Sequence, residues 1–271
     1  AISAALCAAS ERQPAWEPRT VLDIGSGPGT AMWAVAELWP SVERFVLVER
    51  DARMVAAGQR LARGSSRPAI RDAEWQVRDM ASPDALPECD VVIAAYALGE
   101  LAPTQLNGVV QQLWESCREA MVLVEPGTPR GFLTLQAGRH LLSDLGAHTV
   151  APCPHDAPCP LLGSSRWCHF SVRLERSRVH RLVKRAELAY EDEPYAYIAM
   201  SRQPGLPIEA RVIGAPRVGH GHVELELCTV TGVHGTIASR RDREAYRSAR
   251  RLRWGAAVPR PSSSTDEDDG G

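Results

Sequence analysis

The sequence contains no long hydrophobic run, because no stretch reaches the roughly 18–20 consecutive apolar residues that a membrane-spanning helix needs. Its opening residues 1–7 are too short for a signal peptide and lack a basic flank. Seven cysteines among 271 residues do not suit a secreted disulfide scaffold. With 44% hydrophobic residues, the chain predicts one substantial core with a smaller appendage and no membrane association.

Neither sign of charge predominates, since the formal net charge at pH 7 is only −2. This sum conceals a gradient of charge along the chain. Residues 1–150 carry 13 basic and 18 acidic side chains, whereas residues 151–265 carry 18 basic and 11 acidic ones. An acidic cluster at 266–269 cancels part of that excess. Lys184 is the single lysine, and arginine suits forked contacts to phosphate and stacking on bases. The second half therefore predicts a nucleic-acid partner, although a GC-rich genome would produce the same arginine bias.

One glycine-rich stretch organises the rest of the chain. The apolar run 21–24 contains an aspartate, a helical pattern begins at Thr30, and between them glycine occupies every second position: Gly25, Gly27 and Gly29. This order predicts a strand, a tight turn and a helix start, where bare backbone and a helix N-terminus can receive a ligand. An ordinary strand-to-helix turn is the alternative. A second apolar run, 45–48, ends in Glu49 about one βαβ unit later, where a carboxylate can bind ribose hydroxyls.

The order Asp-x-Gly-x-Gly-x-Gly resembles the first motif of class I methyltransferases, which bind S-adenosylmethionine (SAM). A dinucleotide fingerprint would instead need glycine at the position of Thr30. In the methyltransferase family, residues matching 79 and 80 contact adenine, and the strand matching 90–96 ends beside the reacting methyl group. For Asp79, the alternative is a solvated carboxylate in a turn. The resemblance implies SAM-binding roles for Asp23, Gly25, Gly27, Gly29, Glu49, Asp79, Met80 and Ala95.

Apolar runs of strand length alternate with helix-like segments along the first half of the chain. We expect strands at 45–48, 75–78, 90–95 and 121–124 and helices at 30–39, 52–63, 104–117 and 132–145. Such alternation predicts an α/β, Rossmann-like fold with a mostly parallel sheet and helices on both faces. Residues 147–151 and 195–200 suit the last two strands, which would form a hairpin interrupted by an insertion of about forty residues.

Three cysteines gather in this insertion, at positions 153, 159 and 168, and a fourth, Cys228, ends the apolar strand 223–227. Thiolates bind iron–sulfur clusters or zinc, and sulfur chemistry alone does not separate the two. His155 and His169 are reserve ligands. For the remaining cysteines, Cys7, Cys89 and Cys117, we expect small buried hydrophobic side chains.

A more specific resemblance is carried by four segments, residues 151–161, 167–170, 190–193 and 225–229. Together they are similar to the methyltransferase-like small-ribosomal-subunit assembly proteins of mitochondria and bacteria, over about residues 19 to 255. In that family the matching cysteines hold a four-iron, four-sulfur cluster, so the resemblance implies this role for Cys153, Cys159, Cys168 and Cys228. It also implies small-subunit rRNA as the partner. The chain departs from the family by lacking most of the expected N-terminal helical region.

These observations predict five segments in order. Residues 1–18 are the remnant of a helical region, 19–150 the SAM-binding core and 151–194 the cysteine-rich insertion. Residues 195–255 supply the last core strand and a small β-containing extension with the fourth cysteine, and 256–271 form a disordered acidic tail. We expect a monomer in a bacterial cytoplasm, with the mitochondrial matrix as the alternative.

Two arginine-rich stretches, 166–185 and 240–253, flank the proposed metal ligands and predict a surface for an rRNA backbone. Solvated helix faces with internal ion pairs are the alternative. Tyr246 and Trp254 are candidates for base stacking, although helical aromatics more often pack in a core.

The sequence leaves catalysis open. The segment 94–100 lacks the Asn/Asp-Pro-Pro-aromatic signature of amino-methylating enzymes and offers only Tyr96 and Glu100, and Cys89 precedes the strand instead of following it. An rRNA methyltransferase is the leading hypothesis. The alternatives are a catalytically inactive assembly factor and a zinc-stabilised methyltransferase with a non-RNA substrate.

Overall fold

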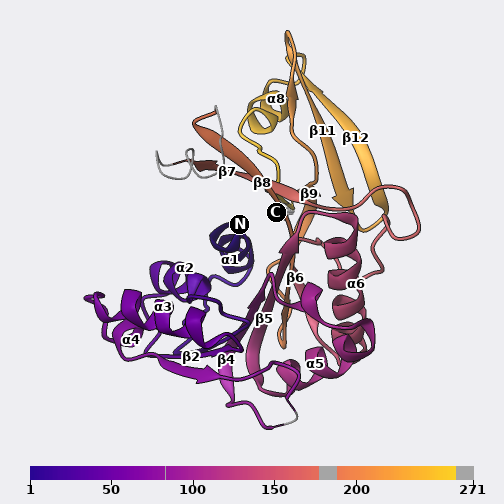
Figure 1. The fold of residues 1–271 in the computed structure, drawn as a ribbon. Helices are drawn as coiled ribbons and strands as arrows, with labels where there is room; N and C mark the ends of the chain where they lie inside the picture. Colours follow the sequence, from indigo (N-terminus) through magenta and orange to yellow (C-terminus); the bar gives the residue numbers. More distant parts are fainter. Residues whose placement is uncertain (83, 177–187, 261–271) are drawn as a thin grey trace, which may run out of the picture.

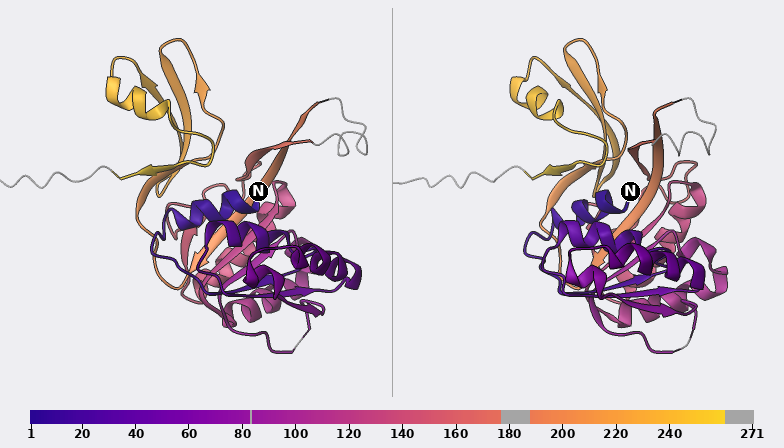
Figure 2. Two further views of the ribbon diagram at one scale, coloured as in Figure 1. Left: turned by 90° about the vertical axis from the view of Figure 1, so that its left-hand side faces the viewer. Right: turned by 60° about the vertical axis from the view of Figure 1, so that its left-hand side comes forward.

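A computed structural model describes residues 1–82, 84–176 and 188–260. An α/β core carries two projecting β-structures, a long hairpin and a C-terminal sheet, which leave the core on the same side (Figures 1 and 2). Helix α1 (Ile2–Ser10) lies at the base of both projections. In the part of the chain that the structure describes, no helix is long and apolar enough to cross a bilayer.

The core sheet has the strand order β3-β2-β1-β4-β5-β8-β6. Its parallel half contains β1 (Thr20–Ile24), β2 (Arg44–Glu49), β3 (Glu74–Val77), β4 (Cys89–Ala95) and β5 (Cys117–Pro126). Strand β8 (Tyr190–Ser201) runs antiparallel between β5 and β6 (His148–Ala151). The predicted mostly parallel α/β sheet is confirmed, including the closing antiparallel strand.

Helices cover both faces of the sheet and bury its nearly continuous apolar strands. One core cluster packs α1 and α2 (Thr30–Leu38) on the sheet, and a second packs α5 (Pro103–Glu115) and α6 (Pro129–Asp144) on the opposite face. Helix α3 (Ala52–Arg63) begins where the Asp51 side chain accepts a hydrogen bond from the Arg53 amide. Two short elements, α4 (Pro68–Arg71) and the 3-10 turn η1 (Leu98–Glu100), complete the core.

The insertion is smaller than the sequence analysis expected. Strand β8 begins at Tyr190, before residue 195, and pairs along its outer half with β7 (Phe170–Glu175) to build the projecting hairpin. The predicted buried role of Cys7 is wrong, because this thiol is exposed while its neighbour Leu6 faces the core; Cys89 and Cys117 are buried as predicted.

The C-terminal sheet contains β9 (Ile208–Val212), β10 (Arg217–Val218), β11 (His222–Thr229), β12 (Gly232–Ser239) and β13 (Ala257–Pro259), with α8 (Arg243–Ala249) packed beside β11 and β12. Residues 257–259, which the sequence analysis assigned to the acidic tail, therefore pair with β9 as a strand. Residues 261–271 of that predicted tail lie outside the described part of the chain.

Candidate functional site

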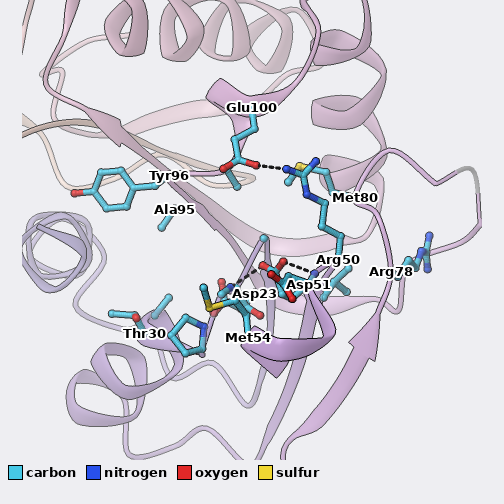
Figure 3. A pocket seen from close by; sticks show the side chains of 18 of the residues that line it. Asp23, Thr30, Arg50, Asp51, Met54, Arg78, Met80, Ala95, Tyr96 and Glu100 are labelled. Carbon is cyan, nitrogen blue, oxygen red and sulfur yellow. Dashed lines mark hydrogen bonds and ion pairs between the residues drawn. The ribbon is translucent and has the colours of Figure 1, made fainter. Parts of the chain in front are cut away.

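A pocket of about 550 Å³ opens at the carboxyl ends of β1, β2 and β4 (Figure 3). Ligands bind at this edge in open parallel α/β sheets. Seven of the eight residues proposed from sequence to bind SAM line the pocket; they are Asp23, Gly25, Gly27, Glu49, Asp79, Met80 and Ala95. Gly29, the eighth, is the N-cap residue of α2 and is not among the residues that line the pocket.

The glycine loop has a backbone that only glycine adopts without strain, since φ is +63° at Gly25, +54° at Gly27 and +84° at Gly29. A methyl group at Gly25 would lie 2.5 Å from the Ala97 Cβ, and one at Gly29 would lie 2.9 Å from Trp75. At Gly27 the same position is open space. The loop therefore packs tightly on its neighbours at two positions and leaves room for a ligand at the third.

Glu49 lies across this loop at the end of β2. Its carboxylate accepts hydrogen bonds from the Gly27 amide at 2.9 Å and the Asp51 amide at 2.8 Å. The next residue, Arg50, pairs with Glu100 at 2.8 Å across the pocket (Figure 3). The carboxylate predicted to hold ribose is thus fixed by backbone donors beside the open face of Gly27.

Asp23 is the most unusual ionisable group of the pocket. It is only 1% exposed, and its Oδ2 has no hydrogen-bond partner. Burial, with the nearby charge of Glu49, raises its pKa to about 8. A buried carboxyl group with a free oxygen at a pocket wall suits a cationic ligand group, which would satisfy that oxygen and favour the ionised form.

Asp79 and Met80, the two residues predicted to contact adenine, both line the pocket, but Asp79 also has a role in a turn. The Asp79 carboxylate accepts a 2.8 Å hydrogen bond from the Ala81 amide, as a turn-stabilising carboxylate does, and it also lines the pocket. Met80 lies against the glycine loop, with its methyl group 3.2 Å from where a Gly25 Cβ would be. The turn and the ligand interpretations are therefore compatible at Asp79.

A smaller cavity of about 190 Å³ adjoins this pocket and shares Tyr96 and Glu100 with it. Glu125, which was not a candidate from the sequence, lines this cavity from the penultimate position of β5; it is only 2% exposed and accepts a hydrogen bond from the Gly99 amide at 3.1 Å. Burial raises the pKa of Glu125. The signal in the sequence was its place next to the strand-breaking Pro126 at the ligand-binding edge of the sheet.

The four predicted metal ligands line one small cavity, although they come from distant parts of the chain. Cys153 and Cys159 follow β6, Cys168 precedes β7, and Cys228 lies in β11. The cavity has a volume of about 20 Å³, roughly enough for one water molecule. Burial raises the pKa values of the Cys159 and Cys228 thiols, that of Cys228 to about 12.

A metal site is not confirmed by this convergence. Among the described residues, no group of three or more His, Cys, Asp or Glu side chains has a geometry that could hold a metal ion. A single zinc ion needs its thiolates within about 2.3 Å of one point. Of the reserve ligands, His155 hydrogen-bonds the Ala157 carbonyl, and His169 stacks on Trp167.

Comparison with known proteins identifies the family to which this chain belongs. The family model described as "Mitochondrial small ribosomal subunit Rsm22" matches residues 1–259. The chain belongs to the Rsm22 family. It is 31% identical over 284 residues to the human "Ribosome assembly protein METTL17, mitochondrial", covering 96% of this chain and 59% of that protein. The family resemblance drawn from the sequence is thereby confirmed, without its iron–sulfur site.

Two further comparisons are more distant. The Schizosaccharomyces pombe "Rsm22-cox11 tandem protein 2, mitochondrial" is 24% identical over 299 residues, covering 88% of this chain and 38% of that protein. The chain thus spans about three-fifths or less of the length of these relatives. The solved magnesium protoporphyrin IX methyltransferase of Synechocystis PCC 6803, with bound SAM, is 14% identical with a TM-score of 0.47, over 74% of this chain and 78% of that one.

The two arginine stretches of this Rsm22-family chain differ in structure. In the first, the described arginines are paired with acids from other segments: Arg166 with Glu226, Arg173 with Asp192 and Arg176 with Glu191. Its other basic residues, at 178, 181, 184 and 185, lie outside the described residues. For the described part of this stretch, the alternative of internal ion pairs is therefore the correct one. A count of charges within the stretch does not show this, because the acidic partners lie in other segments of the sequence.

The arginines of the second stretch have no acidic partners of this kind among the described residues. No ion pair joins the arginines of residues 240–253 to any acid in the described chain, and several of them surround the Tyr246 ring on α8 in one concave surface: Arg240, Arg243, Arg247, Arg250 and Arg251. Trp254 does not share this surface, since its ring packs edge-on against His169 at 5.2 Å. Of the two stacking candidates, only Tyr246 lies among the arginines.

Proposed function

We propose that the chain binds SAM at the β1–β2–β4 edge, holds a thiolate-ligated metal group at four cysteines, and acts on small-subunit rRNA during ribosome assembly. The observation that carries the SAM assignment is the buried, unpartnered Asp23 oxygen beside the open face of Gly27. SAM presents an ammonium and a sulfonium group, and either is a suitable partner for that oxygen. Membership of the Rsm22 family supports the ribosomal context.

Within the pocket, each residue has a role that follows from its chemistry. Glu49 would accept hydrogen bonds from the ribose hydroxyls, with the α2 N-terminus and the Gly25–Gly29 backbone beside it. Met80 and Asp79 would contact adenine, and Ala95 would face the methyl-bearing end. SAM, when bound, would supply the methyl group.

The donor set supports a thiolate-ligated group at Cys153, Cys159, Cys168 and Cys228, and we propose a four-iron, four-sulfur cluster with zinc as the alternative. When bound, the group would link three parts of the chain: the loop after β6, the segment just before β7, and strand β11 of the C-terminal sheet. The proposal keeps both because donor chemistry alone does not separate them.

The rRNA partner rests on the arginines around Tyr246. Guanidinium groups without carboxylate partners suit phosphates, and the half-buried Tyr246 ring among them offers a surface for a stacked base. Two relatives are named as a ribosome assembly protein and an Rsm22 tandem protein, both mitochondrial, which supports the mitochondrial matrix over a bacterial cytoplasm. A monomer stays the expected state.

Catalysis is the part of the proposal with two versions. Tyr96 lines both the SAM pocket and the adjoining cavity, and Glu125 lines the adjoining cavity, where a methyl acceptor would enter; this supports an rRNA methyltransferase. An assembly factor that uses SAM only as a structural ligand would need neither side chain. A methyltransferase for a small molecule or protein would not need the arginine surface.

A SAM titration with paired glycine variants tests the first step. Gly27→Arg puts a side chain into the open ligand space, whereas Gly146→Arg introduces the same residue at a similar φ of +83°, also in open space, after α6. We expect Gly27→Arg to abolish calorimetric SAM binding and Gly146→Arg to retain it. Equal SAM binding by both variants would refute the pocket assignment.

The same pair separates the two versions. In a methyl-transfer assay on small-subunit rRNA, the enzyme version predicts transfer by wild type and Gly146→Arg and none by Gly27→Arg. If Gly27→Arg fails to bind SAM yet supports normal subunit assembly, the enzymatic version loses its main support.

A further inference from the structure

Three arginines are buried around the four-cysteine cavity without an acidic partner. Arg12, Arg139 and Arg211 are 6%, 4% and 1% exposed, and no ion pair of the described residues includes them. They come from three separate places: the segment after α1, the middle of α6, and β9. A buried guanidinium group without a counter-charge is destabilising, as any unpaired buried ion is.

All three side chains bind backbone carbonyls of the loop that carries Cys153 and leads to Cys159. Arg12 donates to the Val150 carbonyl at 2.7 Å and the Cys153 carbonyl at 2.8 Å. Arg139 donates to the carbonyls of residues 155 and 157 at 2.9 and 2.8 Å, and Arg211 donates to that of residue 152 at 2.7 Å. Carbonyl dipoles satisfy the N–H groups but do not cancel the charges.

Arg211 lies nearest to a predicted ligand. In the β9–β11 pairing it is directly opposite Cys228, so the two side chains leave the sheet as cross-strand neighbours. Its Nε and Nη1 donate to the carbonyls of residues 152 and 255, whereas its Nη2 is buried with no partner. One buried N–H₂ group beside Cys228 is thus unsatisfied. Burial lowers the pKa of Arg12; Asp156, the carboxylate that opposes this shift, forms no ion pair with Arg12.

Neutral thiols cannot compensate these charges, but metal-bound thiolates can. Four thiolates carry four negative charges, and a zinc ion or an oxidised four-iron cluster core brings two positive ones, which leaves a dianion in either case. We propose that Arg12, Arg139 and above all Arg211 are the counter-charges of a dianionic, thiolate-ligated group, positioning residues that make the cavity specific for an anionic occupant. This inference rests on the metal part of the proposed function.

The proposal predicts opposite effects of one substitution on two forms of the full chain. In the metal-loaded form, Arg211→Met removes a counter-charge, so metal loss to a chelator should accelerate about 10- to 100-fold, the usual cost of losing a group that supports metal ligands. In a metal-free Cys228→Ala background, the same substitution removes an uncompensated buried charge, so the melting temperature should stay equal or rise. Arg211→Lys keeps the charge and should retain the metal within a few-fold.

Arg202 provides a control for the loss of guanidinium–carbonyl hydrogen bonds; unlike Arg211, it is exposed and lies over the Trp114 ring at 4.3 Å. It also donates only to backbone carbonyls, those of Trp114 and Cys117, but at the other end of β8, away from the cysteines. Arg202→Met should lower the melting temperature of both forms equally and leave chelator-driven metal loss unchanged. If iron is present, Arg211→Met should also shift the reduction potential to a more negative value, which a loss of packing alone would not do.

The outcomes are distinguishable. Anaerobically purified wild type without bound metal would refute the metal part of the proposed function, and this inference with it. Bound metal with equal loss rates in wild type and Arg211→Met would refute the inference alone. Equal destabilisation of the loaded and the metal-free forms by Arg211→Met would likewise refute it, since Arg211 would then act only through its hydrogen bonds.

Discussion

The Tyr96 phenol donates a 2.8 Å hydrogen bond to the Glu193 carboxylate, and this bond joins the end of β4 to the base of the projecting hairpin. Tyr96 is the one non-glycine residue with positive φ, +58°, in the described chain. Strained backbone of this kind persists where surrounding contacts hold it, most often at functional sites. Burial and the Glu193 bond raise the pKa of Tyr96, so the phenol stays protonated and acts as a donor.

Tyr96→Phe tests whether this bond serves catalysis or only structure. Losing it should lower the free energy of unfolding by about 1 kcal/mol in urea titrations. In the enzymatic version, methyl transfer should fall about 100-fold while the Kd for SAM stays within a few-fold. Glu193→Gln keeps an acceptor and should cost less stability. Unchanged methyl transfer by an active Tyr96→Phe protein would contradict a role in the reaction.

Asp23 predicts an unusual pH dependence. Because its pKa is raised from 3.8 to about 8, the folded protein binds a proton that the unfolded chain has released between these values. The contribution of Asp23 to the free energy of unfolding therefore falls as pH rises from about 4 to about 8. Asp23→Asn removes this fall and should be at least about 1 kcal/mol more stable at pH 8.5, or roughly 2–4 °C in Tm.

The same variant should bind SAM more weakly, and the pH dependence of SAM binding should flatten. In wild type, SAM affinity should increase with pH as the Asp23 carboxyl ionises opposite the cationic ligand. Glu119→Gln is the control, since burial also raises the pKa of Glu119, which lies on β5 away from the pocket. Parallel SAM affinity profiles for wild type and Asp23→Asn would contradict the proposed contact.

Much of the core could be predicted because its signals are local. The glycine order after Asp23, the apolar run ending at Glu49 and the helix from Ala52 to Arg63 each depend on residues within one turn or one strand. The convergence of the four cysteines followed from the family resemblance, since sequence distance says nothing about where Cys228 meets the others.

What the sequence did not reveal depends on contacts between distant segments. The acids that pair with Arg166 and Arg173 lie 60 and 19 residues away. The buried Arg12 and Arg211 look like ordinary surface arginines in the sequence, because their partners are backbone carbonyls on other elements. Cys7 was misassigned because helix α1 has small apolar residues on several sides, so its buried face is poorly marked.

Cysteine substitution tests the metal site directly. Cys228→Ala should remove bound metal from anaerobically purified protein and, for an iron–sulfur cluster, its broad visible absorption. Cys89→Ala is the control, because Cys89 is fully buried in the core cluster between the sheet and helices α5 and α6 and does not line the cysteine cavity. It should lose stability through the smaller side chain but retain the metal. Equal metal content in both variants would contradict the assignment of Cys228.

The arginine surface around Tyr246 predicts salt-dependent RNA binding. Replacing Arg243, Arg247 and Arg251 together by Gln should weaken rRNA binding and reduce the slope of log affinity against log salt by about 1 for each lost phosphate contact. The measurement is a filter-binding titration with a small-subunit rRNA fragment at several salt concentrations.

A matched triple variant separates local contacts from net charge. Arg19, Arg44 and Arg118 are exposed, but they pair with Glu43, Glu74 and Glu88 on the core. Replacing these three by Gln changes the total charge by the same amount, yet it should leave the slope nearly unchanged, since ion-paired guanidinium groups release few counterions from RNA. If both triples weaken rRNA binding equally, the concave surface is not the RNA contact and the effect is one of overall charge.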